Sequence, residues 1–205
     1  MTQSEIIAKT LVILNEAGGD TQLSLLSEDT LRISDYIEKS IKDGVRMVQA
    51  VSPQKGVCPK NGKETSLATD TKNGVASLVV PDGFVSLIGV RLSGWSRVCT
   101  EAEDMDSESY LRQCNSYTRS GANHPVCILG FGDDGVRSLF LYPYKESYTL
   151  DMFMYESEYS STSDISDDFS LAVCYMTASV VYTIFENKAA ADAMRQMAVA
   201  CLSKK

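Results

Sequence analysis

Hydrophobic residues recur with a helical period at both ends of the chain and with a strand period in its middle. The first helix is expected from about residue 4 to residue 16. Thr2 and Glu5 have the spacing of a capping box, in which side chains satisfy backbone N–H groups at a helix start. Gly18 and Gly19 can supply the positive φ that ends a helix. The apolar face of this helix consists of Ile7, Leu11 and Leu14, flanked by Ile6 and Ile13.

A second helix is expected from about residue 28 to residue 50, capped by Ser27 and ended before Pro53. Gly44 lies in its middle, where glycine costs roughly 1 kcal/mol relative to alanine. Either a neighbour approaches closely there or the helix tolerates the loss. The apolar repeat of the helix is Ile33, Ile37, Ile41, Val45 and Val48.

The segment 52–74 that follows is polar, contains Gly and Pro, and has no sustained period. This composition predicts a long loop or a loose hairpin. Loops of this length in compact domains tend to be binding elements or mobile segments. The sequence leaves open whether the segment contacts a partner or is a disordered surface excursion.

Between Phe84 and Tyr155 the pattern changes to β-branched, aromatic and alternating runs, which are typical of strands. A further strand precedes them and ends at Pro81. Gly132 and Gly135 enclose a hairpin turn of the Asp-Gly type. The expected strands are 75–80, 84–95, 126–131, 137–144 and 147–155, and a short helix is expected over 107–114.

Two of these strands carry expectations about their faces. In the strand that begins near residue 85, Ile88, Val90 and Leu92 should share one face, because alternate residues of a strand point the same way. In the last strand, the even-numbered positions of 148–154 form a mostly apolar face. The odd-numbered positions of 149–155 form a mixed face, and whether it is covered stays open.

The C-terminal region predicts a pair of helices. The first, over about residues 168–186, has few polar breaks and should be buried nearly all round. Its cover is either the sheet and the first two helices or another protomer. Asn187 should cap the last helix, over 188–203, whose small face permits close packing. That face consists of Ala189, Ala190, Ala193 and Ala200.

These elements predict an α+β fold with two N-terminal helices, a small and mostly antiparallel β core, and a C-terminal helical hairpin. A chain of 205 residues suits one domain or two small ones. We interpret residues 1–205 as a single protomer. Its parts are helices in 1–51, a β core with a short helix in 75–156, and the C-terminal helices in 167–203.

The negative charge of the chain limits the kinds of partner that it is expected to bind. The net charge is −8, and residues 151–168 hold six acids and no lysine or arginine. Such a run repels a phosphate backbone, so tight binding to nucleic acid is not expected. The run is either a solvated face or an acidic wall that could line a channel. Its acids are Asp151, Glu156, Glu158, Asp164, Asp167 and Asp168.

Residues able to do chemistry are sparse. The six cysteines form no CxxC pair, which favours buried thiols over a disulfide framework or a zinc site. His124 is the only imidazole, and no signature of a Ser-His or Cys-His site accompanies it. We therefore expect no enzyme, no metal and no cofactor. No apolar run reaches the length of about 18 residues that spans a bilayer, so we expect a soluble chain without a membrane partner.

Short motifs between residues 81 and 126 carry a family resemblance: PD at 81–82, RLSGW at 91–95, YLRQ at 110–113, NSYTR at 115–119 and HPV at 124–126. With an LFLYP strand and two terminal helices, they resemble the ring-forming head-to-tail connectors of tailed bacteriophages. The chain is most similar to the portal-proximal ring proteins of crAss-like phages, although its cysteine content is high for such a protein. The motif residues are Arg91, Gly94, Trp95, Arg112, Tyr117, Arg119 and Pro125.

The resemblance implies a homo-oligomeric, dodecameric ring. One side of the ring would bind the portal protein and the other the next tail or ring protein. DNA would pass through an axial channel without specific binding. The protein would be located in the virion at the head-to-tail interface, and in the host cytoplasm during assembly.

The same motif residues have physical roles that need no family. Trp95 ends a strand, where a large amphipathic ring is expected to plug the edge of a core rather than face a partner. Arg112 and Arg119 are expected to fasten the long link onto the sheet through ion pairs. Their candidate partners are Glu101, Asp104 and Glu108.

By analogy with similar adaptors, the terminal helix is expected to dock on the portal. The candidate contacts are Lys188, Arg195, Lys204 and Lys205. Segment 52–74 is expected to reach a neighbouring ring and to become ordered only there. Two alternatives remain: a small intracellular acidic interaction module, and a hydrolase that uses His124.

Overall fold

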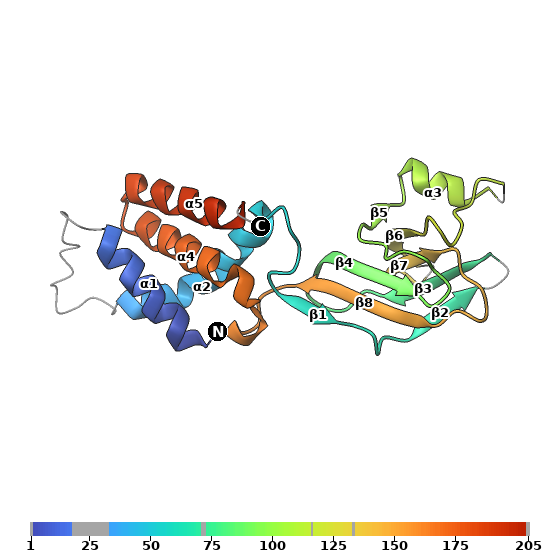
Figure 1. The fold of residues 1–205 in the computed structure, drawn as a ribbon, viewed down its shortest axis with the longest axis horizontal. Coiled ribbons are helices and arrows are strands. Elements are labelled where there is room, and N and C mark those ends of the chain that lie inside the picture. Colours follow the sequence, from blue (N-terminus) through green and yellow to red (C-terminus); the bar gives the residue numbers. More distant parts are fainter. Residues whose placement is uncertain (1, 18–32, 71–72, 116, 133, 204–205) are drawn as a thin grey trace. The chain divides into compact units, whose positions relative to one another are not determined.

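The computed structural model describes residues 2–17, 33–70, 73–115, 117–132 and 134–203. The chain forms two compact units. The helical unit joins both ends of the chain, Met1–Cys58 and Glu158–Lys205, and the β unit is the middle of the chain, Pro59–Ser157 (Figure 1). The α+β class is confirmed, with the N-terminal helices and the C-terminal helical pair in place.

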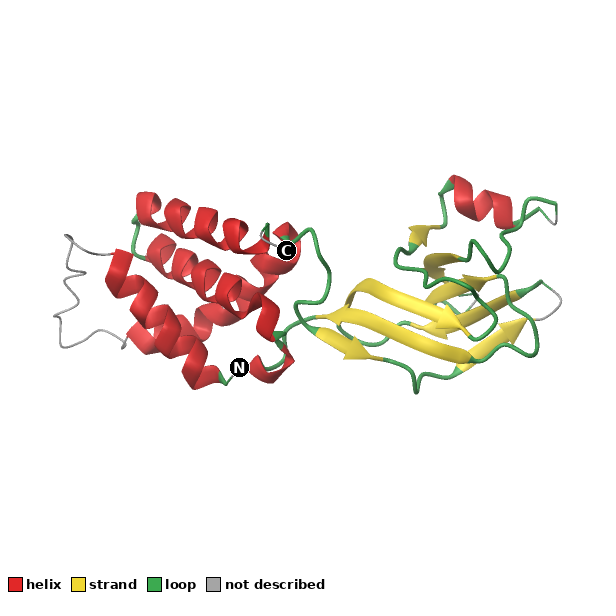
Figure 2. Cartoon of the chain, viewed as in Figure 1, coloured by secondary structure: helices red, strands yellow, loops and turns green. Residues whose placement is uncertain are grey.

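The helical unit is an assembly of long helices, drawn in red in Figure 2. Its central helix is α4, which contacts the other three. Two short 3-10 turns, η1 and η2, lead into α4. No helix in the described ranges is both long and apolar enough to cross a membrane. The elements are α1 (Gln3–Ala17), α2 (Ile33–Val51), η1 (Thr162–Asp164), η2 (Asp167–Phe169), α4 (Ser170–Ile184) and α5 (Lys188–Leu202).

Helix α4 is buried on most sides because α1, α2 and α5 surround it. Val173 and Ala178 are fully buried in the core of the helical unit. The hydroxyl of the buried Tyr182 donates a hydrogen bond to the carbonyl oxygen of Leu14, at 2.8 Å, which ties α4 to α1. The expected burial of this helix is confirmed, and helices of the same unit provide the cover.

Gly44 explains how closely α2 approaches α4. A Cβ atom at this position would lie 2.4 Å from Oγ1 of Thr177 and 3.0 Å from the backbone nitrogen of the same residue. Only glycine leaves room for that approach, so a close neighbour accounts for the glycine. The apolar repeat of α2 faces the same core, and its buried members are Ile37, Ile41, Val45 and Val48.

The capping contacts expected from the sequence are present at the starts of α1 and α5. The backbone N–H of Thr2 donates to Oε2 of Glu5 at 2.8 Å, and that of Glu5 donates to Oγ1 of Thr2 at 3.3 Å. The hydrogen bond from the Thr2 backbone lowers the pKa of Glu5. Asn187 caps α5 by accepting from the backbone N–H of Ala190 at 3.1 Å. The expected cap Ser27, the expected helix residues 28–32, and Gly18 and Gly19 lie outside the described residues.

Small β-sheets make up the β unit, together with the short helix α3 (Glu108–Gln113). The three-stranded sheet is antiparallel, in the order β1-β8-β4. The five-stranded sheet has the order β2-β3-β7-β6-β5, and only β5 runs parallel to its neighbour. The strands are β1 (Pro59–Asn61), β2 (Leu67–Asp70), β3 (Val75–Val79), β4 (Phe84–Leu92), β5 (Glu103–Asp104), β6 (Val126–Phe131), β7 (Arg137–Tyr142) and β8 (Leu150–Ser157).

One apolar cluster joins the two sheets. Strands β4 and β8 contribute Val90 and Phe153, both fully buried. Strands β3 and β7 contribute Leu78 and Leu141, which are also fully buried. The β6–β7 hairpin closes through Gly135, at φ +75°, as the Asp-Gly composition predicts.

The expected face of β4 is wrong at one position. Val90 and Leu92 are buried, but Leu87 takes the core position that the alternation assigned to Ile88. The register of β4 against β8 is irregular at several points, including the step from Leu87 to Gly89. An irregularity of this kind shifts the alternation by one residue, so the faces predicted from strict alternation fail.

The mixed face of β8 is covered. Phe153 on that face is fully buried, whereas Met152 and Met154 on the apolar face are only partly buried. The ring of Tyr155 stacks on the rings of Phe84 and Phe153, with centroid distances of 5.8 and 5.4 Å. Within residues 152–155, the aromatic residues of the mixed face are therefore the ones that pack into or against the core of the β unit.

Segment 52–74 was expected to be a long loop or a loose hairpin, and the structure shows short strands within it. It contains β1, which pairs with β8, and β2, which pairs with β3. Val57 and Cys58 are buried in the core of the helical unit. The backbone N–H of Gly62 donates to the carbonyl of Phe153 at 2.8 Å. Deleting 56–72 would therefore remove core residues of the helical unit and two strands of the β unit, and would not test binding to a neighbouring ring.

Candidate interaction surfaces

The RLSGW motif stabilises the three-stranded sheet. Arg91 donates from Nε to Oδ2 of Asp151 at 2.8 Å and contacts the same oxygen through Nη2. The pair joins β4 to β8, and both side chains are partly exposed. Exposed pairs of this kind contribute roughly 0 to 1 kcal/mol. Asp151 therefore lies in an ion pair on the sheet.

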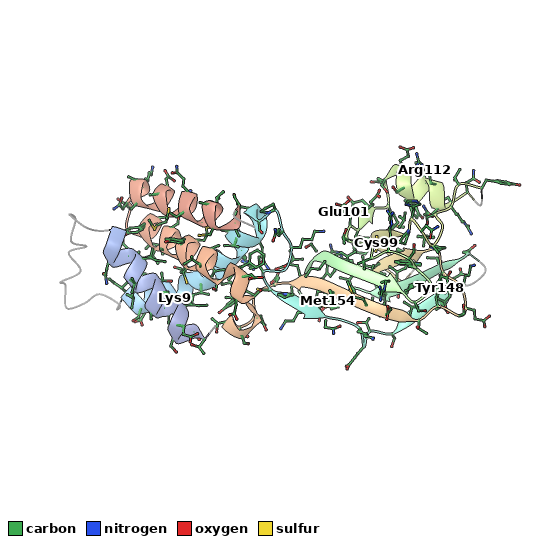
Figure 3. The ribbon with its side chains drawn as sticks, in the orientation of Figure 1. Lys9, Cys99, Glu101, Arg112, Tyr148 and Met154 are labelled. Carbon is green, nitrogen blue, oxygen red and sulfur yellow. The ribbon has the colours of Figure 1, made fainter. Side chains whose placement is uncertain are left out.

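Trp95 lies in the core of the β unit, with 5% of its surface exposed. Its Nε1–H donates to the carbonyl oxygen of Pro143 at 2.8 Å, so the polar end of the ring is satisfied. The expected role as a core plug is confirmed. A Cβ atom on Gly94 would lie 2.0 Å from the ring of Tyr148, so that ring, labelled in Figure 3, packs directly on the glycine.

The YLRQ motif forms α3, which begins at its N-cap Ser107. Arg112, labelled in Figure 3, forms an ion pair with Glu108 one turn earlier, at 2.7 Å. Glu108 is one of its expected partners, but both residues belong to α3, so this pair does not fasten the link onto the sheet. Gln113 is buried, and its side-chain oxygen accepts from the backbone N–H and the hydroxyl of Ser120 at 3.0 and 2.8 Å. This glutamine fastens the loop after α3 to the helix.

The expected ion pair of Arg119 is wrong among the described residues. Its Nε and Nη1 donate instead to the carbonyl oxygens of Gln113 and Asn73, at 2.8 and 2.9 Å. The side chain therefore links the loop after α3 to the turn before β3. Carbonyl oxygens orient a guanidinium but do not neutralise its charge.

A pocket of about 450 Å³ lies between α3, the loop that follows it, and strands β3, β6 and β7; we call it the α3 pocket. Tyr110, Arg119 and Tyr142 supply polar groups to its lining, and Phe140 and Phe131 supply aromatic surface. Burial raises the pKa of both tyrosines. Both hydroxyls are therefore protonated near neutral pH and able to donate hydrogen bonds.

The other motif residues are at the surface. Tyr117 is 96% exposed in the loop after α3. Pro125 is partly buried just before β6. His124 is exposed, and no side chain among the described residues forms a hydrogen bond or ion pair with it. Within the described ranges, no group of three His, Cys, Asp or Glu side chains is placed to hold a metal ion.

The acids of 151–168 are divided between the two units. Asp151 and Glu156 belong to the β unit, and the other four belong to the helical unit. Glu156 is only 3% exposed, so its assignment to a solvated face is wrong. Glu158 lies 3.8 Å from Arg46, and Asp164 accepts from the backbone N–H of Ser161 at 3.2 Å. Asp167 and Asp168 are exposed at the turn before α4.

Helix α5 has one buried and one exposed face. The expected small face is wrong, because its alanines are exposed or only partly buried. The alanines of α5 that are buried are Ala191 and Ala198. Lys188 is exposed near the helix start, and Arg195 lies 3.6 Å from Asp192. Lys204 and Lys205 lie outside the described residues.

Sequence reasoning missed the α3 pocket and the buried glutamine that supports it. In the sequence, Gln113 belongs to the YLRQ motif and Tyr142 to the LFLYP strand, and neither pattern indicates a pocket. An available signal was the density of tyrosine, glutamine and arginine within 110–119, a segment expected to be a surface link. The chain matches no protein-family model and no curated protein.

Proposed function

We propose that the chain is a structural subunit of a phage head-to-tail connector ring, which joins the portal to the tail and leaves a channel for DNA. The resemblance of the stretch containing Arg91, Trp95 and Arg119 to the ring proteins of crAss-like phages carries the proposal. Each of these side chains makes fixed contacts within the β unit. Such contacts support a mechanical role for the motif.

The exposed face of α5 supports portal docking. Met197 and Val199 are 47% and 45% exposed, and Arg195 is exposed on the same helix. Methionine and arginine are enriched in protein interfaces, and exposed apolar side chains gain free energy when a partner covers them. The portal would cover this face in the assembled connector.

The chemistry of the side chains favours this role over a hydrolase. Burial raises the pKa of Cys99 and Cys174, and raises that of Cys127 well above its usual range. These thiols are therefore protonated and weak nucleophiles near neutral pH. His124 lacks a second group among the described residues that could orient it as a general base.

The charge of the chain is compatible with DNA passage. The net charge is −8, and the acids Asp167 and Asp168 are exposed. Acidic side chains repel the phosphates of DNA and do not hold them. The same acids are the basis of the alternative, an acidic module that binds a basic partner. Binding of such a module would weaken steeply as salt concentration rises.

The direct test is decoration of the portal protein of the same virus, followed by sedimentation and negative-stain imaging. Deleting 188–205 is a poor test, because Met194 and Leu202 of α5 lie in the core of the helical unit. The double variant Met197→Glu, Val199→Glu keeps those residues and should abolish decoration. Val79→Glu, at a 51% exposed valine of β3, is the matched control and should decorate normally.

Three results would argue against the proposal. Wild-type protein could fail to bind the portal, the α5 variant could decorate it as well as wild type does, or the control could fail equally. Binding to many basic proteins, lost at moderate salt, would favour the acidic module instead. Hydrolysis that disappears in His124→Ala would favour the enzyme.

A further inference from the structure

The α3 pocket contains a positively charged side chain that forms no ion pair with a carboxylate of a described residue. Arg119 is the only ionised side chain in its described lining, which contains no aspartate or glutamate. Two carbonyl oxygens fix the guanidinium through Nε and Nη1, at 2.8 and 2.9 Å. The remaining nitrogen, Nη2, makes no hydrogen bond to a described residue. A fixed arginine with unused donors suits a carboxylate, which it binds through short, charge-assisted hydrogen bonds.

The tyrosines of the pocket add donors beside this charge. Tyr110 and Tyr142 both line the pocket and both stay protonated near neutral pH, because burial raises each pKa. Arg119 and Tyr142 line the same pocket, and the charge of Arg119 partly offsets the rise in the pKa of Tyr142 that burial causes. The polar part of the lining therefore favours an acceptor with negative charge.

The remaining lining is apolar and partly open. Val75 and Phe140 contribute apolar surface from β3 and β7. Phe131, at the end of β6, lines the pocket although 65% of its surface is exposed. A ligand that fills the pocket must therefore bury an apolar group as well as present an anion.

The elements that form the pocket expose further large apolar side chains. Leu111 on α3 is 63% exposed, and Tyr117 in the following loop is 96% exposed. Neither residue lines the pocket, but both belong to the helix and loop that border it. A small metabolite inside the pocket would leave these side chains in water, whereas a protein partner would cover them.

We propose that the α3 pocket binds a partner protein through an acidic side chain that is followed by a large apolar residue. The carboxylate meets Arg119 and the tyrosine hydroxyls, and the apolar side chain packs on Phe131 and Phe140. This site goes beyond the portal contact assigned to α5. It does not depend on ring assembly, because the isolated chain contains the whole site.

The test uses the full chain and two blocked dipeptides, acetyl-Asp-Phe-amide and acetyl-Asn-Phe-amide, followed by ¹H–¹⁵N NMR. The aspartyl peptide should shift the amide signals of α3, β6 and β7 and bind about tenfold more tightly than the asparaginyl peptide. Arg119→Gln should abolish this preference. Arg97→Gln, at an exposed arginine outside the lining, is the matched control and should keep it.

Arg119→Gln also removes the two hydrogen bonds through which Arg119 holds the loop after α3, so a second variant is needed. Tyr142→Phe removes a donor and leaves both bonds of Arg119, and it should weaken aspartyl binding about threefold to tenfold while sparing asparaginyl binding. Equal affinity for the two peptides would overturn the proposal. Equal losses in Arg97→Gln, or displacement of the peptide by an equal concentration of inorganic phosphate, would do so too.

Discussion

The helical unit and the β unit are held together in different ways. In the helical unit, contacts between distant parts of the sequence are mostly apolar. One polar contact is the hydrogen bond from the hydroxyl of Tyr182 to the carbonyl oxygen of Leu14, which lies 168 positions earlier in the sequence. Among the described residues, no hydrogen-bond partner is found for the hydroxyl of its buried Thr177. In the β unit, the buried Gln113 uses both its oxygen and its nitrogen in hydrogen bonds. The helical unit therefore depends on close approach, and the β unit depends on specific polar contacts as well.

This difference can be measured because each unit has its own optical signal. Trp95, the only tryptophan, lies in the β unit, whereas most helical residues lie in the helical unit. Tryptophan emission should follow unfolding of the β unit, and far-ultraviolet circular dichroism should mainly follow the helical unit. The predictions below use both signals, from the largest expected effect to the smallest.

Trp95→Ala should destabilise the β unit by about 3 to 5 kcal/mol, because it removes a buried ring and leaves a cavity. Since the variant has no tryptophan, its stability is read from near-ultraviolet tyrosine signals during urea unfolding. In the wild type, the emission of Trp95 should be blue-shifted. A red-shifted emission that changes only when a partner is added would show instead that Trp95 contacts the partner.

Gly44→Ala should destabilise the helical unit by about 1 to 3 kcal/mol, although alanine is the better helix former. The cause is the new methyl group, 2.4 Å from Oγ1 of Thr177. Circular dichroism should show the loss while the tryptophan transition stays in place. Adding Thr177→Ala should recover part of the loss, and stabilisation by Gly44→Ala alone would contradict the close approach.

Gln113→Ala should destabilise the β unit by about 1 to 2 kcal/mol, because Ser120 loses its acceptor. Tryptophan emission during urea unfolding gives the size of the effect. Arg112→Ala, on the same helix but in an exposed ion pair, is the matched control and should change stability by less than about 1 kcal/mol. Equal effects of the two changes would mean that the buried glutamine has no special role.

Among the cysteines, alkylation should modify Cys114 first, since it is exposed while Cys127 and Cys174 are buried and have raised pKa values. Iodoacetamide at pH 8, followed by peptide mass mapping, orders the rates. The buried thiols should react only when their units open. Early labelling of Cys127 would show that the β unit opens more readily than its core contacts indicate.

Helical periodicity predicted the helical unit well, because a helix that packs on other helices keeps its apolar face along its whole length. The repeat from Ile37 to Val48 and the burial of α4 follow directly from the pattern. For Gly44 the sequence left open a close neighbour or tolerance of the loss, and the close approach of Thr177 decides for the neighbour. The pattern could not show which helix this neighbour belongs to, since that depends on contacts between distant residues.

The β unit was predicted less completely, because irregular pairing and loop contacts leave weak local signals. Strict alternation assigned Ile88 to the core, and an irregular register placed Leu87 there. Segment 52–74 resembles a loop because β1 and β2 are short and become strands only through pairing with β8 and β3. The carbonyl partners of Arg119 could not be predicted either, since backbone acceptors carry no sequence signature.

The central claim, a connector ring, is tested most directly by imaging purified portal complexes after incubation with this protein. The account predicts a ring of copies on one face of the portal, with the symmetry of the portal and an open axial channel. Portals that stay bare at saturating protein, while the protein remains folded by circular dichroism, would contradict it.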